Sequence, residues 1–328
     1  MKPIRVGVVG AGRMGERHCR VFSNLRRVQL VAVCDINESV GNRVSRLFDI
    51  GFYHRVEEIV GEVDAVSIAS PTQLHYDQAL YFLNRGVHVL IEKPIAEDLS
   101  QAEELVKAAE KSGLVVQVGH IENFNPAYIE LKNILDGRLP LAIDFRRLSA
   151  YKGSNKDVDV VLDLMIHDTN LLNDLIKEEP VKLTALGFSV FSDKIDYSTA
   201  HLLYKNGPVA SLTASRVTEQ KIRSIEVTTH DAYINCDLLN KNIAIHRSTV
   251  GEYFNNNQQG VKYHQESIVE WIYVPTFEPL FLQLQHFVDC IFEGKPPSVS
   301  ARDGYNAMKL AITIRDLIEQ NMLELSIS

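Results

Sequence analysis

The first third of the chain alternates between short apolar runs and longer amphipathic stretches. Continuous runs rich in valine and isoleucine are typical of strands buried on both faces, whereas apolar residues three and four apart predict helices. Strands are expected over 4–12, 28–36, 63–70, 88–94 and 114–120, and helices over 14–25, 38–48, 73–86 and 98–113. Ser100 and Glu103 predict a capping box at the start of the last helix. This alternation predicts a parallel sheet covered by helices on both faces.

Beyond about residue 126 the pattern changes to short runs in which apolar and polar residues alternate. A period of two is typical of strands with one face exposed to water, and it predicts an antiparallel sheet. The pair Asn206 and Gly207 lies between two such runs and predicts a hairpin turn. Helices are expected over 127–137, 157–172, 279–294 and 302–320. The fold class is therefore α/β, with a Rossmann-type parallel-sheet domain over 1–121 and an α+β domain with an open antiparallel sheet over 122–328.

Composition narrows the classes of partner and the cellular location. The 328 residues are enough for two domains, and 45% hydrophobic with 23% charged residues is ordinary for a globular protein. A formal net charge of -8 argues against a nucleic-acid partner, which would bind a basic face. No apolar run has the length of a membrane span and no leader pattern precedes the first strand, so no membrane association is expected. The four scattered cysteines predict reduced thiols, a cytoplasmic location and no metal site.

A glycine-rich turn follows the first strand and opens the first helix. Gly10, Gly12 and Gly15 have the spacing G-x-G-x-x-G. In this context the glycines permit a tight turn, close approach of the backbone to a pyrophosphate, and close packing of the helix on the strand. The helix N-terminus, at Arg13 and Met14, presents free N–H groups to phosphate oxygens. The motif therefore predicts a dinucleotide site.

The end of the second strand indicates which dinucleotide is bound. Asp35 stands there, twenty residues after Gly15. A carboxylate at this position accepts hydrogen bonds from the adenosine ribose hydroxyls and repels a 2′-phosphate. We therefore expect NAD, and not NADP, as the cofactor.

A lysine ends a later parallel strand, at the edge where open α/β sheets bind ligands. It is Lys93, in the run Glu92-Lys93-Pro94, whose proline permits a cis peptide bond that holds the turn. A lysine at a strand end is more often a solvated surface residue. Its position beside the cofactor crevice makes it a candidate for chemistry.

The run from 157 to 172 is apolar apart from one polar stripe. In a helix, Asp163, His167 and Asn170 would share a face. Burial of polar groups without partners costs roughly 2–7 kcal/mol for each group. The stripe is therefore either a structural pair inside the core or a surface that faces a ligand, and the run alone leaves both interpretations open.

Together these motifs resemble those of the glucose–fructose oxidoreductase, inositol dehydrogenase and rhizopine-catabolism family (Gfo/Idh/MocA). The resemblance rests on the order and spacing of GAGRMG, ASPTQLH, EKP and the D-x-x-x-H of Asp163 and His167, and it extends over nearly the whole chain. It implies an NAD-binding Rossmann domain and a second domain with an open antiparallel sheet. It also implies that Lys93, Asp163 and His167 are the catalytic residues.

The resemblance further implies two sets of binding residues. The cofactor set is Gly10, Gly12, Arg13, Met14, Gly15, Asp35, Ser70, Pro71, Thr72, His75, Glu92 and Lys93. The substrate set is His120, Asn123, Arg147, Tyr151, Lys152, Asp163 and His167. Related sequences tend to carry an arginine at the position of Asn123, and Arg146, Arg147 or Lys152 could supply the missing charge.

Within the family, GHIENFNPAY and DVDVVLDLMIHD are most similar to the branch that acts on nucleotide-linked N-acetyl sugars. The similarity implies that NAD oxidises the 3-hydroxyl of a UDP-linked N-acetyl sugar, such as UDP-N-acetylglucosamine. The resulting 3-keto sugar would serve the synthesis of 3-amino sugars of the lipid A type in lipopolysaccharide. Two alternatives are a dehydrogenase of inositol or a free sugar, and a non-catalytic regulator that senses NAD or another ligand.

The sequence leaves the proton acceptor open between two residues. An imidazole has a pKa near operating pH, which favours His167 as the general base, with Lys93 stabilising the alkoxide. A desolvated Lys93 could be the base instead. The family resemblance also implies a homodimer or homotetramer formed through the second domain's sheet, where small residues and threonines alternate over 210–215.

Overall fold

The computed structural model describes residues 2–151, 158–191, 193–205, 207–253 and 262–326, with the backbone alone at 248–253, 262–267 and 323–326. The chain forms two compact units. The first comprises residues 1–124 and 277–310, and the second comprises 125–276 and 311–328. The predicted boundary after residue 121 lies close to this division, but residues 277–310 belong to the first unit and not to the second as we expected.

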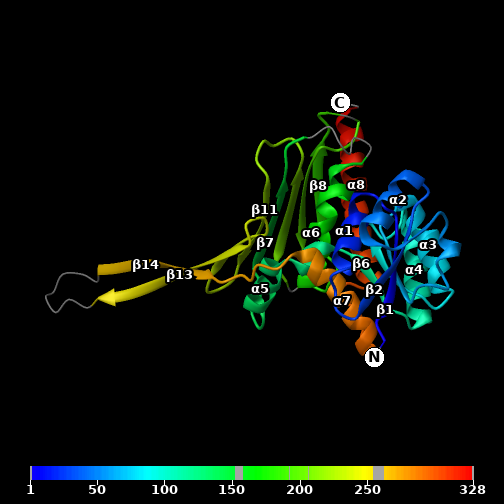
Figure 1. Ribbon diagram of the computed structural model, residues 1–328. Coiled ribbons are helices and arrows are strands. Elements are labelled where there is room, and N and C mark those ends of the chain that lie inside the picture. Colours follow the sequence, from blue (N-terminus) through cyan, green and yellow to red (C-terminus); the bar gives the residue numbers. More distant parts are fainter. Residues whose placement is uncertain (1, 152–157, 192, 206, 254–261, 327–328) are drawn as a thin grey trace. The chain divides into compact units, whose positions relative to one another are not determined.

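The first unit contains a parallel sheet with the strand order β3-β2-β1-β4-β5-β6 (Figure 1). All five neighbouring pairs are parallel, as the apolar runs predicted. The strands are β1 (Ile4–Val9), β2 (Val28–Cys34), β3 (Gly51–Tyr53), β4 (Ala65–Ile68), β5 (His88–Glu92) and β6 (Val116–Gly119). The carboxyl ends of the central strands β1, β4 and β5 therefore lie along one edge of the sheet.

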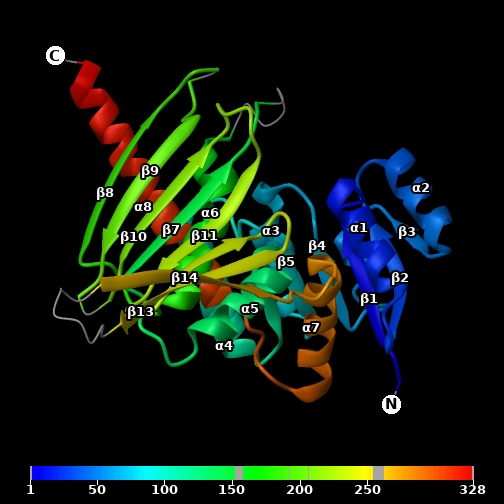
Figure 2. The same ribbon diagram turned by 90° about the vertical axis from the view of Figure 1, so that its left-hand side faces the viewer.

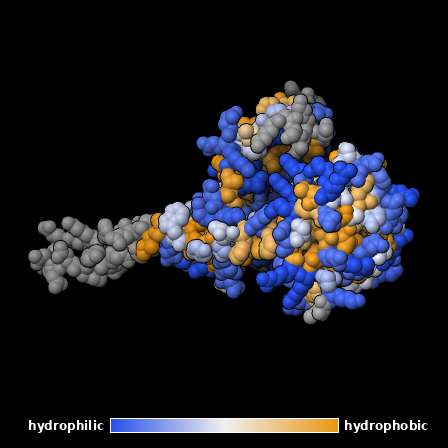
Figure 3. All heavy atoms as spheres, in the orientation of Figure 1, coloured by the Kyte–Doolittle hydropathy of each residue, from blue (hydrophilic) through white to orange (hydrophobic). Residues whose placement is uncertain are grey.

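Helices connect these strands and cover the sheet. They are α1 (Arg13–Phe22), α2 (Glu38–Phe48), α3 (His75–Leu83) and α4 (Leu99–Ser112), with the short 3₁₀ turns η1 (Val56–Glu58), η2 (Thr72–Leu74) and η3 (Ile121–Phe124). The N-cap of α4 is Asp98, whose carboxylate accepts from the N–H of Gln101, so the predicted cap at Ser100 is wrong by two residues. In the view of Figure 3, hydrophilic side chains surround scattered hydrophobic ones on the visible surface of this unit.

Helix α7 (Pro279–Glu293) completes the first unit. Its side chains Leu284, Phe287 and Val288 are fully buried in the same apolar cluster as Val8 of β1 and Phe22 of α1. This burial is the physical reason that residues distant in sequence join the Rossmann unit. An amphipathic pattern predicts a helix, but it does not tell which sheet the helix covers.

The second unit contains an eight-stranded sheet with the order β14-β13-β12-β11-β7-β10-β9-β8 (Figure 2). Its pairs are antiparallel except that β10 pairs with β7 in parallel, so the sheet is mixed and not wholly antiparallel as predicted. The strands are β7 (Ala142–Leu148), β8 (Lys182–Phe188), β9 (Tyr197–Leu203), β10 (Val209–Ser215), β11 (Ile222–Thr228), β12 (Tyr233–Asp237), β13 (Asn242–Tyr253) and β14 (Lys262–Ile272). The hairpin predicted between β9 and β10 is confirmed, although Asn206 of its turn lies outside the described residues.

The two faces of this sheet differ in character. Side chains on one face, such as Phe145, Ala200 and Leu212, are buried, whereas their neighbours in sequence on the other face are partly or fully exposed. The second unit also contains α5 (Pro126–Leu135), the π-helical turn η4 (Val161–Met165), α6 (Ile166–Leu175) and the residues of α8 (Ala301–Ser326) from 311 onward. We call the partly or fully exposed face of the eight-stranded sheet the open face.

Strands β13 and β14 extend beyond the rest of the sheet as a two-stranded ribbon (Figure 1). Their ladder runs from the pair Ile243–Ile272 to the pair Tyr253–Lys262. The neighbouring strand β12 pairs with β13 only as far as His246. Past that residue, as far as the chain is described, the two strands of the ribbon pair only with each other. In the described part of the chain, no helix has the length and apolar character that crossing a bilayer requires.

Candidate active site

The glycine-rich turn has the geometry that a pyrophosphate requires. Gly10 has a φ of +91°, and a Cβ there would lie 2.7 Å from backbone atoms of the strand-end residue Ala69. A Cβ on Gly15 would lie 1.7 Å from the carbonyl oxygen of Gly10, so helix α1 can approach the turn only with glycine at that position. A Cβ on Gly12 would meet nothing within 4 Å. The first and third glycines are therefore required by packing, whereas the second borders open space at the N-terminus of α1, where Arg13 and Met14 begin the helix.

Asp35 is fixed beside this turn by two backbone N–H groups. One carboxylate oxygen accepts from Ala11 at 2.6 Å and the other accepts from Asn37 at 2.8 Å. The carboxylate is half-buried, and each oxygen retains a second lone pair for a ribose hydroxyl. The carboxylate is therefore held next to the glycine-rich turn, and its contact with an adenosine ribose stays a prediction.

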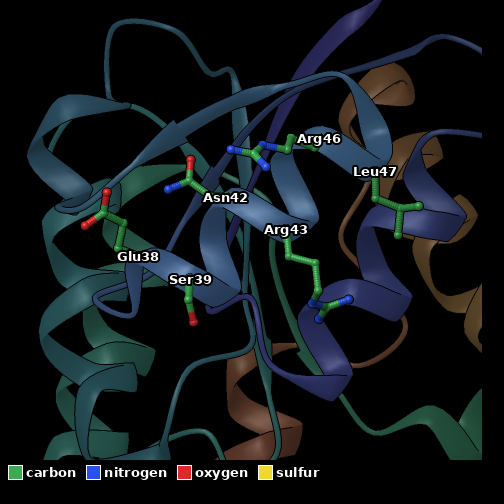
Figure 4. Close-up of a pocket in the computed structure, with 6 residues that line it drawn as sticks. All are labelled: Glu38, Ser39, Asn42, Arg43, Arg46 and Leu47. Carbon is green, nitrogen blue, oxygen red and sulfur yellow. The ribbon is translucent and has the colours of Figure 1, made fainter.

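A shallow hollow of about 800 Å³ lies over the outer face of α2, which follows Asp35 (Figure 4). Its basic side chain Arg43 points toward α1 and pairs with Glu16 at 2.7 Å. A guanidinium held in this way is less available to a 2′-phosphate, which agrees with a preference for NAD. All residues that line the hollow belong to one helix, so we assign it no ligand of its own.

A buried histidine links the turns that follow strands β4 and β5. Ser70, Pro71 and Thr72 follow β4, and the hydroxyl of Ser70 donates to Gln78 at 2.6 Å. The ring of His75 is 1% exposed, with Nδ1 2.8 Å from the carbonyl oxygen of Pro94 and Nε2 2.9 Å from that of Ser70. The bond between Lys93 and Pro94 is cis, as the sequence suggested. His75 therefore contacts the backbone of both turns, and its ring is not exposed toward a ligand.

A second buried histidine, which the sequence analysis did not single out, contacts the residue before the lysine. His18 of α1 is fully buried, with Nδ1 2.6 Å from the hydroxyl of Ser67 and Nε2 3.1 Å from a carboxylate oxygen of Glu92. The other oxygen of Glu92 accepts from the backbone N–H of Lys93 at 3.3 Å. His18 lies three residues after Gly15, on the helix face that packs against the sheet, and this position was the available signal.

His120 and Asn123 follow β6 in the first unit. His120 is buried, and burial, with a smaller contribution from the nearby charge of Lys93, lowers the pKa of its imidazole to about 3. The ring is therefore neutral at physiological pH and lies in the neighbourhood of the lysine. The side-chain oxygen of Asn123 is buried and accepts no hydrogen bond from any described residue. An acceptor in this state favours a ligand that donates.

The stretch that carries Asp163 and His167 is not the continuous α-helix that its spacing predicted. Asp163 lies in the π-helical turn η4, closed by a bond from the N–H of Ile166 to the carbonyl oxygen of Val161, and His167 is the second residue of α6. Asp159 caps this turn, since its Oδ1 accepts from Val161 at 2.9 Å and from the next residue at 2.8 Å. Asp163 and His167 are half-buried. Widened turns of this kind often occur at functional sites.

Two further polar residues of α6 differ in their surroundings: Asp168 forms a buried ion pair, and Asn170 has an unsatisfied amide oxygen. Asp168 receives Nε of Arg147 at 3.0 Å and Nη2 at 2.7 Å, and both side chains are almost fully buried. This pairing argues against a direct substrate contact by Arg147, because its guanidinium is committed to a carboxylate on the buried face of the sheet. Asn170 is 2% exposed, and its Oδ1 has no hydrogen-bond partner among the described residues. Asn170 therefore joins the candidates for ligand contact.

The remaining expected substrate residues lie after β7. The ring of Tyr151 stacks on that of Phe191, with centroids 4.1 Å apart and an interplanar angle of 16°. Lys152 lies outside the described residues. The structure thus brings together Lys93, Glu92, His75 and His120 in the first unit, and it places Tyr151, Asp163 and His167 in the second.

Comparison with known proteins agrees with this geometry. Residues 4–120 match the family described as "Oxidoreductase family, NAD-binding Rossmann fold", and residues 144–235 match the "GFO/IDH/MocA C-terminal domain". UDP-N-acetylglucosamine 3-dehydrogenase of Acidithiobacillus ferrooxidans is 31% identical over 316 residues, which are 96% of this chain and 97% of the relative. Its solved structure gives a TM-score of 0.87 and covers 98% of this chain and 99% of that one.

A more distant structure shares the fold. Scyllo-inositol dehydrogenase from Lactobacillus casei, solved with bound NAD(H) and scyllo-inositol, has a TM-score of 0.80 at 21% identity and covers 98% of each chain. In this chain the glycine turn, the fixed Asp35 and the open space at Gly12 fit NAD, the cofactor class named for the family that matches residues 4–120. The chain belongs to the Gfo/Idh/MocA family of NAD-binding oxidoreductases.

Proposed function

We propose that this enzyme oxidises the 3-hydroxyl of UDP-N-acetylglucosamine with NAD and releases the 3-keto sugar nucleotide. The observation that carries the proposal is the near full-length similarity to the Acidithiobacillus ferrooxidans enzyme of that activity, at 31% identity. The sites for both halves of the reaction support it, because the first unit carries the dinucleotide turn and the second carries the Asp163 and His167 pair. A 3-keto sugar is a substrate for transamination, which would give a 3-amino sugar of the lipid A type.

The proposed roles follow from the chemistry of each side chain. NAD, when bound, supplies the acceptor for the hydride that leaves C3 of the sugar. His167 takes the proton of the 3-hydroxyl on a ring nitrogen, since an imidazole titrates near operating pH. The ammonium group of Lys93 donates to the same oxygen and stabilises its developing negative charge. Asp163 orients the substrate and the imidazole.

The neutral state of His120 supports the role of Lys93 as a cation. A neutral ring beside an ammonium group adds no competing positive charge and can accept a hydrogen bond from it. If Lys93 were the base instead, it would have to lose its proton before each turnover. The pH dependence of kcat/KM for the Lys93→Arg variant separates the two assignments, because arginine retains the charge and cannot act as a base.

The UDP moiety needs polar contacts that a free sugar does not. Asn123, Tyr151 and Lys152 are the proposed contacts. Arg147 is left out because its guanidinium is paired with Asp168. Arg146 is left out because it is exposed on the face of β7 opposite to buried Phe145 and Arg147. Asn123 offers an unsatisfied acceptor, and Lys152 would bring a charge to the pyrophosphate.

We further propose that the enzyme is a homodimer or homotetramer assembled through the open face. Strands β8, β9 and β10 expose Leu186, Phe188, Leu203 and Val209 on this face, which also carries the small side chains of Ser211 and Thr213. Apolar side chains that are 44–61% exposed on one sheet favour burial against another surface. Leu186→Glu together with Leu203→Glu should dissociate the assembly in light scattering, whereas a wild-type protein that is monomeric at micromolar concentration would contradict it.

A deuterium-transfer experiment tests the reaction directly. The enzyme is incubated with NAD and UDP-N-acetylglucosamine deuterated at C3, and the reduced cofactor is analysed by mass spectrometry. We expect deuterated NADH and a 3-keto product that a hydroxylamine trap converts to an oxime. Substrate deuterated at C4 is the matched control and should give unlabelled NADH. Turnover of scyllo-inositol or glucose in place of the UDP-sugar would favour a free-sugar dehydrogenase.

A further inference from the structure

Buried imidazoles contact the residues on both sides of Lys93. We call Glu92, Lys93 and Pro94 the lysine turn. On one side His18 contacts the carboxylate of Glu92, and on the other His75 contacts the carbonyl oxygen of Pro94. Both rings are at most 1% exposed, so neither can itself contact a ligand. The residues that the two rings contact directly precede and directly follow Lys93.

Each imidazole joins the lysine turn to a second, independent anchor. The other nitrogen of His18 lies 2.6 Å from the hydroxyl of Ser67, on the neighbouring strand β4. The other nitrogen of His75 lies 2.9 Å from the carbonyl oxygen of Ser70, directly after that strand. The lysine turn is thereby tied twice to the end of β4.

The carboxylate of Glu92 has little freedom to move within this arrangement. One oxygen faces His18 and the other accepts from the backbone N–H of Lys93. A Cβ on Gly119 of the adjacent strand β6 would lie 2.9 Å from the carboxylate carbon, so the backbone of that strand packs closely against it. The restricted carboxylate of Glu92 therefore fixes the direction in which the chain continues from β5 into Lys93.

We propose that His18 and His75 are positioning residues that hold Lys93 in its catalytic orientation, an inference that rests on the proposed role of Lys93. Positional errors of about 1 Å in a catalytic group can cost on the order of 10²-fold in rate. The two histidines therefore influence turnover through the lysine, without contact with the substrate.

Isosteric amides test each ring nitrogen separately. The amide nitrogen of glutamine reaches the position of Nε2, and that of asparagine reaches the position of Nδ1. His18→Gln and His75→Asn should therefore retain the contact with the lysine turn, whereas His18→Asn and His75→Gln should retain only the contact with Ser67 or Ser70. We expect the first two variants to have a kcat within about threefold of wild type, and the second two to lose at least about tenfold with an unchanged Kd for NADH.

A double-mutant cycle shows whether the histidines act through Lys93. In a Lys93→Met background, the loss caused by His18→Asn or His75→Gln should shrink to less than about twofold. Equal activity of the two variants at either histidine would overturn the proposal. So would a loss that persists in the Lys93→Met background, or an NADH affinity that weakens in step with kcat.

A second readout does not depend on turnover. Trace acetylation with acetic anhydride, followed by mass spectrometry, measures the reactivity of half-buried Lys93 against that of exposed Lys111. We expect labelling of Lys93 to rise several-fold in His18→Asn and His75→Gln and to remain at the wild-type level in the other two variants. His88→Asn, at the opposite end of β5, is the control and should leave it unchanged.

The two readouts separate failure of this inference from failure of the proposed function. Full activity of Lys93→Met would refute the proposed role of Lys93, and no turnover of any UDP-sugar would refute the proposed substrate. In either case the labelling pattern would still report whether the turn is held. Identical labelling of Lys93 in all four variants would show that the histidines do not position it.

Discussion

Arg147 and Asp168 join strand β7 to helix α6 through an almost fully buried ion pair. Nη2 of the arginine lies 2.7 Å from Oδ1 of the aspartate, and Nε lies 3.0 Å from both carboxylate oxygens. Asp168 directly follows His167, so this pair fixes the helix turn that carries the proposed base. The arginine is thus a structural support beside the active site.

Removal of one member of this pair should destabilise the protein strongly. Arg147→Met leaves Asp168 buried without its cation, and breaking such a pair typically costs about 3–5 kcal/mol. Urea unfolding followed by circular dichroism measures the free energy of unfolding. Lys177→Met is the control, since Lys177 is an exposed cation just past the end of α6, and it should change stability by less than about 0.5 kcal/mol. Equal effects of both substitutions would show that the pair is not structurally important.

Asp35 should control the choice between NAD and NADP. Asp35→Asn keeps an acceptor for the N–H of Ala11 or Asn37 but removes the negative charge that would repel a 2′-phosphate. We expect the ratio of kcat/KM for NAD to that for NADP to fall at least about tenfold. Asp77→Asn, an exposed residue in the first turn of α3, should leave the ratio unchanged. Equal use of both cofactors by the wild-type enzyme would contradict the assignment.

The proposed catalytic residues should affect chemistry and not cofactor binding. Lys93→Met and His167→Asn should each lower kcat by about 10²–10⁴-fold, because general acid–base groups typically contribute this much. Neither residue belongs to the glycine-rich turn or to the Asp35 site, so the Kd for NADH from fluorescence titration should change little. His230→Asn is the control in the second unit, where His230 is exposed in the turn between β11 and β12. Retention of near-full turnover by both variants would make the polar stripe structural.

His120 should make the protein sensitive to mild acid. The unfolded chain binds a proton at this imidazole below a pH of about 6.5, whereas burial, with Lys93 nearby, lowers the folded pKa to about 3. Between these values the unfolded state holds more protons, so stability falls as the pH falls. We expect His120→Gln to remove about 2 kcal/mol of the stability lost between pH 7.5 and 5 in urea unfolding. An unaltered slope in His120→Gln would refute the prediction.

The sequence predicted the cofactor end well because its signals are local. Gly10 and Gly15 are required by contacts of under 3 Å, and such contacts leave a fixed spacing in the sequence. The π-helical turn at Asp163 was not predictable in this way, since an extra residue in one turn leaves the apolar pattern nearly unchanged. The alternation along β7 contained a signal that we did not use: it places Arg146 and Arg147 on opposite faces.

Other differences between prediction and structure arise because a sequence pattern does not show which residue or element its side chains contact. Both Asp98 and Ser100 are good N-cap residues, and the structure selects the aspartate. Helix α7 has the apolar face of any core helix, and only its burial with Val8 and Phe22 shows which unit it completes. His18 could be found from its spacing after the glycine motif, but its contact with Glu92 depends on strand order.

The length of the ribbon formed by β13 and β14 can change without a change in the core of the second unit. Among the described residues of the ribbon past His246, neither strand is paired with another strand of the sheet, so no register elsewhere depends on the ribbon's length. Each pair of residues inserted or removed there alters its span by about 3.4 Å. The length of this projection can therefore diverge between relatives, or be shortened by design, while the eight-stranded sheet that supports His167 keeps its pairing.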